Sequence, residues 1–142
     1  GKLIGRPSTG RLNMFFYDPK TKAKLPYYDR FPLVLPLEPI KGGFLGMNFH
    51  YLPYLLRFRL LERLQKFSDG GFKTSTKMSV SYDIVKGINL VKPTLKKYLY
   101  GYVRSSFLRI DFDESALAAY LPVQRFVKAG TSKVWADSRG MI

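Results

Sequence analysis

Cysteine is absent from the 142-residue sequence, and histidine and tryptophan occur once each. The lack of cysteine excludes disulfide bonds, thiolate zinc sites and cysteine nucleophiles. With one histidine, any transition-metal site would depend on carboxylates for its other ligands. That histidine, His50, lies between Phe49 and Tyr51 in an apolar run. We therefore expect His50 to be a packed, hydrogen-bonded residue and not a catalyst.

Long apolar runs and acidic residues are also scarce. No run approaches the roughly 20 residues that a membrane-spanning helix needs, and the longest, residues 31–37, is interrupted by two prolines. We therefore expect no membrane partner. Ten Asp and Glu stand against 24 Lys and Arg, which gives a net charge of +14. A surplus of this size attracts polyanions, so nucleic acid is the first candidate partner and an acidic protein surface is the second; an anionic membrane surface comes third, and we do not include it among the predicted partners.

Aromatic residues are plentiful, with 11 Phe and 10 Tyr, and 46% of all residues are hydrophobic. This composition argues against a disordered basic tail, and the length suits one domain. Residues 1–10 contain Gly5, Pro7 and Gly10, which disfavour regular structure. We expect a flexible basic arm over 1–10 and a single α+β domain over 11–142.

The N-terminal third predicts a small antiparallel sheet or partial barrel, and helices are expected to follow it. Residues 11–17 and 44–52 are typical of strands, and Lys41-Gly42-Gly43 indicates a turn before the second. Prolines recur through residues 25–40. Because proline has no N–H for a central ladder, this segment is expected to be an edge strand or an extended stretch.

The clearest predicted helix covers residues 54–67. Leucines recur on one side of it, and Arg59, Arg63 and Lys66 gather on the opposite side. Further helices are expected over 93–103 and 116–120, with a short strand over 107–112 between them. Thr131 or Ser132 is expected to cap a last turn that contains Trp135.

The basic residues are the main functional signal. If residues 20–24 are extended, the ammonium groups of Lys20, Lys22 and Lys24 point the same way. The alternative is a solvated turn whose lysines prevent pairing with the sheet edges of other molecules. Interleaved tyrosines can stack on bases or pack against protein. The residues predicted to bind nucleic acid or an acidic partner are Lys20, Lys22, Lys24, Arg57, Arg59, Arg63, Lys66, Lys96 and Lys97. Those predicted to form a protein interface are Arg6, Tyr27, Tyr28 and Phe31.

One acidic cluster, Asp111, Asp113 and Glu114, allows the hypothesis of a magnesium-dependent nuclease. The same residues also suit the end of a strand and the start of a helix, where negative charge is stabilised. We favour the second interpretation. The sequence therefore predicts no enzymatic activity, no metal, no cofactor and no small-molecule substrate.

Several motifs, Tyr17-Asp18-Pro19-Lys20, the run 25–33 and the run 43–53, resemble small virion-associated proteins of the large contractile-tailed, T-even-like bacteriophages. The resemblance covers mainly residues 11–67, with a weaker echo over 134–139. It implies a structural component of a virion, in the tail, baseplate or neck, that contacts other virion proteins and resides in host cytoplasm during assembly. The alternative is a sequence-independent nucleic-acid-binding protein, such as a DNA-end-binding virion protein that grips phosphates with Lys and Arg.

Overall fold

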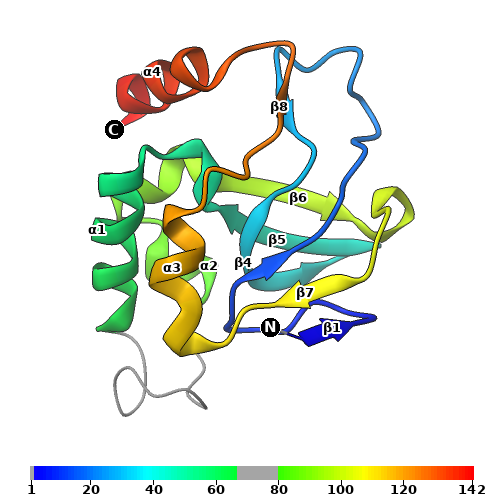
Figure 1. Cartoon of the computed structure of the whole chain (residues 1–142), viewed down its shortest axis with the longest axis horizontal. Coiled ribbons are helices and arrows are strands. Elements are labelled where there is room, and N and C mark those ends of the chain that lie inside the picture. The colour runs from blue at the N-terminus through cyan, green and yellow to red at the C-terminus, as the bar shows by residue number, and fades with distance from the viewer. Residues whose placement is uncertain (1, 67–79) are drawn as a thin grey trace.

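Helices cover one face of an antiparallel β-sheet, and the last helix crosses one end of the molecule (Figure 1). The computed structural model describes residues 2–66 and 80–142. The elements, with η for short 3-10 helices, follow in this order: β1 (Lys2–Ile4), β2 (Asn13–Met14), β3 (Tyr28–Asp29), β4 (Leu33–Ile40), β5 (Gly43–Asn48), η1 (Phe49–Tyr51), α1 (Tyr54–Gln65), α2 (Tyr82–Val85), η2 (Asn89–Thr94), β6 (Leu95–Leu99), η3 (Tyr100–Tyr102), β7 (Phe107–Arg109), η4 (Phe112–Glu114), α3 (Ser115–Tyr120), β8 (Phe126–Val127) and α4 (Thr131–Met141).

Among the described residues, the main sheet has six strands in the order β1-β7-β2-β4-β5-β6, and β3 and β8 form a second, two-stranded sheet. All neighbouring strands are antiparallel. The predicted α+β class with an antiparallel sheet is confirmed. Two strands of the main sheet, β6 and β7, come from the second half of the chain, where we expected mainly helices.

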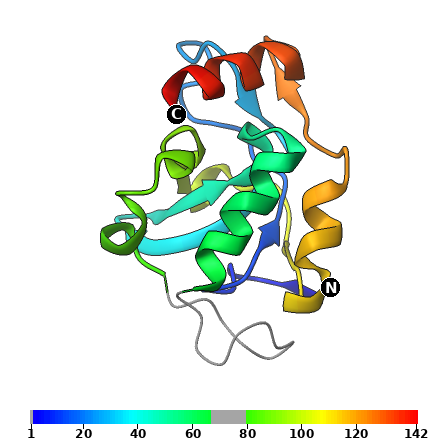
Figure 2. The same ribbon diagram turned by 90° about the vertical axis from the view of Figure 1, so that its left-hand side faces the viewer.

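Successive residues of the central strands fill two cores on opposite faces of the sheet, as the two-residue period of a strand requires. Leu33 and Leu35 pack in the core beneath the helices, whereas Val34 belongs to an aromatic core on the other face. Figure 2 shows α1 and α3 in front of the sheet, over the first of these cores. The aromatic core consists of Phe15, Tyr17, Val34, Phe44, Tyr98 and Phe107.

The proline-rich segment forms β4, which is a central strand, so our expectation of an edge strand is wrong. The physical reason lies in the register. β4 pairs with β2 only through Leu33 and Val34, so Pro36 and Pro39 face a neighbour on the β5 side alone. A bulge between Pro36 and Glu38 further relaxes the ladder. The proline half of β4 therefore behaves as an edge, where a missing donor is tolerated.

The predicted turn at residues 41–43 joins β4 to β5 in a hairpin. Gly42 has a φ of +76°, in the left-handed region that glycine adopts without steric cost. Gly43 has a different requirement, because a Cβ there would collide with the backbone carbonyl of Tyr98. Gly43 thus lets β6 lie directly against β5.

The expected arm contains a strand, because Lys2–Ile4 pair with Phe107–Arg109 at the edge of the main sheet. The side chain of Asn13 accepts a hydrogen bond from the Ser8 backbone N–H at 2.9 Å. The expectation that the arm has no regular structure is therefore wrong for residues 2–4. The flexibility of residues 1–10 and the boundary at residue 10 stay predictions.

The predicted helix over 54–67 is confirmed as α1, which ends at Gln65. Leu60, Leu61 and Leu64 on its apolar side are buried. Residue 67, the last of the predicted helix, lies outside the described residues.

The helix expected over 93–103 is wrong. This stretch continues η2 into strand β6 and then η3. The Leu-Lys-Lys-Tyr-Leu pattern of β6 fits a helical period, but pairing with the free side of β5 offers a full ladder to the same residues. The tertiary pairing outweighs the weak local preference.

Candidate functional site

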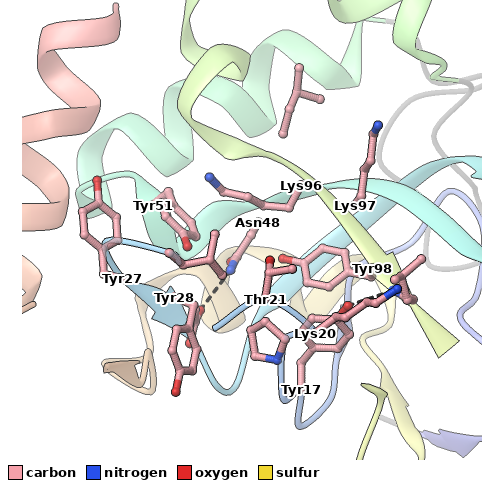
Figure 3. A pocket seen from close by; sticks show the side chains of 15 residues that line it. Tyr17, Lys20, Thr21, Tyr27, Tyr28, Asn48, Tyr51, Lys96, Lys97 and Tyr98 are labelled. Carbon is pink, nitrogen blue, oxygen red and sulfur yellow. Dashed lines mark hydrogen bonds between the residues drawn. The ribbon is translucent and has the colours of Figure 1, made fainter. Parts of the chain in front are cut away.

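A pocket of about 450 Å³ opens beside β6, on the aromatic face of the sheet. Figure 3 shows its side chains coming from the turn after Tyr17, from β3, from the end of β5 and from β6. The volume lies in the range of small-molecule sites. Its lining consists of Tyr17, Pro19, Lys20, Thr21, Leu25, Tyr27, Tyr28, Asp29, Asn48, Tyr51, Leu95, Lys96, Lys97, Tyr98 and Leu99.

Lys96 is the half-buried cation of this pocket. Its Nζ lies 4.0 Å from the ring centroid of Tyr51, in cation–π geometry. Burial lowers the pKa of Lys96 below its usual value. Within the described ranges, its ammonium makes no hydrogen bond and no ion pair. Lys97, the next residue of the strand, is exposed and points in another direction (Figure 3).

Two tyrosines of the pocket are fixed by their hydroxyl groups. The Tyr17 hydroxyl accepts a hydrogen bond from the Leu99 backbone N–H at 2.8 Å. The Tyr27 hydroxyl donates to Asp137 of α4 at 3.0 Å. Burial, together with Asp137, raises the pKa of Tyr27 to about 12. Burial also raises the pKa of Tyr51 and of Tyr98. All these rings are therefore neutral at physiological pH and present uncharged aromatic surfaces.

A buried carboxylate lies at the base of the pocket. Asp29 accepts hydrogen bonds from Asn48 Nδ2 at 3.0 Å and contacts His50 Nδ1 at 2.8 Å. The backbone N–H groups of Phe31 and Arg125 donate to its other oxygen, both at 3.0 Å. Burial alone would raise the pKa of Asp29, but these hydrogen bonds and the charge interaction with His50 lower it. The carboxylate is thus satisfied by the fold itself, and the prediction that His50 is packed and hydrogen-bonded is confirmed.

The lysine-rich segment after Asp18 is a turn and not an extended strand. The lysines of residues 20–24 are therefore not aligned by strand alternation, and the alternative of a turn is the one observed. Lys22 pairs with Asp18 at 3.1 Å. Lys128, the residue that follows β8, stabilises this turn, because its Nζ donates to the carbonyl oxygens of Lys22 and Leu25. Lys20 is exposed and lines the pocket, which Lys22 and Lys24 do not. One of the three predicted lysines therefore reaches the pocket.

Arg57, which we predicted to bind nucleic acid or an acidic partner, is fully buried, so that prediction is wrong. Its guanidinium donates to the carbonyl oxygens of Leu52 at 2.7 Å, Ala119 at 2.9 Å and His50 at 3.4 Å. Burial lowers its pKa to about 10, so it stays charged at neutral pH. The carbonyl group of Ala119 in α3 lies against this guanidinium, so packing between the two helices encloses it. Arg57 is a structural residue with no access to a ligand.

The other predicted residues are distributed over separate surfaces. Arg59, Arg63 and Lys66 are exposed at α1, and no residue of α1 lines the pocket. Arg6 lies in a second pocket of about 390 Å³ near η3. Phe31 stacks on Phe16 with centroids 4.5 Å apart. The predicted basic residues therefore do not share one surface, and the pocket unites Lys20, Lys96 and Lys97 with Tyr27 and Tyr28.

The acidic cluster of the nuclease hypothesis lies away from this pocket. Asp111 is within ion-pair distance of Arg109, at 3.3 Å, and of Arg11, at 3.8 Å. Asp113 and Glu114 belong to η4, directly before α3. Residues 2–66 and 80–142 contain no group of three His, Cys, Asp or Glu arranged to hold a metal ion.

Sequence reasoning missed Tyr17, Asn48 and Tyr51 as pocket residues. All three lie in stretches that the pattern assigned to strands, where apolar neighbours suggested a structural role. Their one signal was the density of tyrosine near the basic residues. Their convergence depends on the β5–β6 pairing, which the sequence did not predict.

These features define a basic α+β protein with a pocket lined by lysine and tyrosine. Residues 1–138 match the model of a family described as phage T4 terminal DNA protecting protein, so the chain belongs to that family. The resemblance to virion-associated proteins of contractile-tailed phages is thereby confirmed. The searches of curated proteins and of solved structures found no match. Of the described helices, none is long and apolar enough to span a bilayer.

Proposed function

We propose that this protein binds the ends of DNA in a phage particle, gripping phosphates with lysine side chains and without reading base sequence. The pocket is the observation that carries the proposal, because it gathers, beside tyrosine rings, lysines that have no acidic partner within residues 2–66 and 80–142. The family description, with its reference to protecting terminal DNA, supports this alternative from the sequence over a tail, baseplate or neck role.

The charges available for phosphate binding are on the rim of the pocket. Lys20 and Lys97 are exposed, and neither forms a hydrogen bond or an ion pair with a residue in the described part of the chain. Each lysine that neutralises a phosphate releases condensed counterions, which drives binding and makes it depend on salt. The net charge of +14 adds long-range attraction to DNA.

The proposed action is to occupy the DNA end, not to cut it. Under this proposal the protein breaks no bond and requires no metal or cofactor. Incubation of linear DNA with the protein and magnesium or manganese is expected to leave the DNA intact. Metal-dependent cleavage that disappears in Asp111→Asn would overturn this part of the proposal.

The test of binding is a salt titration with two forms of one DNA. A duplex minicircle and the same molecule cut once are titrated with protein at several salt concentrations. We expect tighter binding to the cut form, and a log–log slope of about −0.9 for each phosphate contact. Lys97→Gln should reduce the slope by about 1. Lys86→Gln is the matched control, because Lys86 pairs with Asp83 on α2, away from the pocket.

Two outcomes would contradict the proposal at different levels. Binding that is absent, or that does not change with salt, would exclude phosphate gripping. Salt-dependent binding with equal affinity for the circle and the cut form would leave a general DNA-binding protein and exclude recognition of ends.

Contact with other virion proteins is a second proposed function, supported by an apolar surface. Leu55 of α1 is 62% exposed, and Leu117 and Tyr120 of α3 are 63% and 60% exposed. α1 and α3 pack together, with the rings of Phe58 and Tyr120 4.0 Å apart. Exposed apolar patches often mark protein interfaces. Replacing Leu55 and Leu117 by serine should reduce incorporation into particles without changing DNA affinity; unchanged incorporation would remove this candidate.

A further inference from the structure

The pocket contains a cation that has no counter-charge in the described part of the chain, beside aromatic rings that are not stacked on each other. The ammonium of Lys96 is positioned over Tyr51, and its stem is half-buried beside Asn48. Asp29 is the one carboxylate among the described lining residues, and it already accepts four contacts from the fold. A desolvated cation of this kind is best satisfied by an anion that comes from outside.

The aromatic rings surround this cation from different elements. Tyr51 and Tyr98 flank Lys96, from η1 and from β6, and Tyr28 comes from β3 (Figure 3). The rings of Tyr27 and Tyr51 are 6.2 Å apart and tilted by 34°, so neither covers the face of the other. Tyr51 and Tyr98 are buried, and Lys96 already lies over Tyr51, so the half-buried Tyr28 is the ring that can accept a planar base by stacking, whatever its sequence.

From this arrangement we infer that the pocket receives one nucleotide, the last of a DNA strand, with its phosphate on Lys96 and its base against Tyr28. The inference rests on the proposed function and names the part of the DNA that is recognised. A nucleotide inside a duplex is stacked on both faces and paired, so it cannot enter the pocket without being extruded. A terminal nucleotide has one free face and leaves the stack at lower cost. The pocket thereby distinguishes an end from the interior.

The decisive variants compare two neighbouring lysines. Lys96→Met keeps an aliphatic stem over Tyr51 and removes the charge in the pocket, whereas Lys97→Met removes the same charge from the exposed rim. With the minicircle and its cut form, Lys96→Met should reduce the preference for the cut form by roughly tenfold or more, as loss of a charged hydrogen bond predicts. Lys97→Met should weaken binding to both forms equally. Lys96→Arg should retain the preference.

A second measurement locates the nucleotide directly. A linear duplex that carries 5-iodouracil at its terminal base should photo-crosslink to Tyr28, whereas the same base at an internal position should not. Tyr28→Leu provides a variant that leaves Lys96 in place and should also lose the preference for ends. Matching thermal unfolding curves verify that each variant is folded.

The outcomes separate the inference from the proposed function. If the wild-type protein prefers the cut form and Lys96→Met and Tyr28→Leu keep that preference, the nucleotide pocket is overturned and end binding stands. Equal crosslinking from terminal and internal iodouracil also overturns it. If the wild-type protein shows no salt-dependent affinity for either form, the proposed function itself fails.

Discussion

Nδ1 of His50 lies 2.8 Å from Oδ2 of Asp29, and both side chains are almost completely buried. This pair connects η1 to β3 beneath the pocket. The fold supplies Asp29 with three further hydrogen bonds, from Asn48, Phe31 and Arg125. The pair therefore stabilises the walls of the pocket. Its removal is expected to change the stability of the fold more than the binding of DNA.

The first prediction concerns acid stability. Because the pKa of Asp29 in the folded protein lies below its ordinary value of 3.8, ionised Asp29 stabilises the fold above pH 3.8. This contribution is lost as the pH falls through the folded-state pKa. Asp29→Asn should lower the free energy of unfolding at neutral pH by about 1–3 kcal/mol, since it weakens or removes the hydrogen bonds that this buried carboxylate accepts. The variant should also flatten the acid limb of stability measured by urea unfolding across pH.

Asp83→Asn is the control for this experiment. Asp83 pairs with Lys86 at the surface, at 3.2 Å, and surface pairs contribute about 0–1 kcal/mol. An acid limb that is equally steep in Asp29→Asn and in the wild type would contradict the role assigned to Asp29.

The second prediction concerns Arg57. Its replacement by methionine leaves the carbonyl oxygens of Leu52 and Ala119 without their donors. Each buried unsatisfied group costs about 1–3 kcal/mol, so Arg57→Met should lower the free energy of unfolding by at least about 2 kcal/mol. Arg59→Met, two residues further along α1 at an exposed position, should change it by less than about 0.5 kcal/mol. Equal effects of the two substitutions in urea unfolding would show that Arg57 is not a structural residue.

The third prediction concerns the contact between β5 and β6. A Cβ at Gly43 would meet the Tyr98 carbonyl, so Gly43→Ala must push β6 away. We expect a loss of about 1–3 kcal/mol, the usual range for overpacking. Because β6 carries Lys96, DNA-end preference should fall as well. Gly101→Ala, where no atom lies within 4 Å of an added Cβ, should change neither quantity. Wild-type stability and end preference in Gly43→Ala would rule out this steric role.

The fourth prediction concerns the docking of α4. Nε1 of Trp135 donates to the carbonyl oxygen of His50 at 2.9 Å, which joins the last helix to η1. Trp135→Phe should cost about 1 kcal/mol for this hydrogen bond, in addition to lost packing. Far-UV circular dichroism in urea measures the change, with Ser132→Ala on the exposed side of the helix as control. A shift no larger than that of Ser132→Ala would mean that this contact does not hold α4.

Local signals predicted several elements well. The 3.6-residue period of leucines marked α1, and Lys41-Gly42-Gly43 marked the β4–β5 turn. The apolar surroundings of His50 indicated a packed residue. Each of these depends on residues close together in the sequence, where the backbone geometry is fixed by near neighbours.

The predictions for β6 and β4 were wrong because they depend on pairing between strands that are far apart in the sequence. The segment that becomes β6 has an ambiguous local pattern, and its partner β5 lies far earlier in the chain. The prolines of β4 argued against a central strand, but they face no partner on the β2 side. Neither relationship can be derived from a single segment, because each depends on which strands become neighbours.

The sequence by itself determined the charge of this protein, its lack of cysteine chemistry, its α+β class and its kinship with phage virion proteins, since composition and local pattern do not depend on long-range contacts. Only the tertiary structure decided that Arg57 is internal and that Lys96 lies over Tyr51. The physical reason is that burial depends on which surfaces pack together. A helical or strand period states which residues share a face, but only packing against other elements determines whether that face meets protein or solvent.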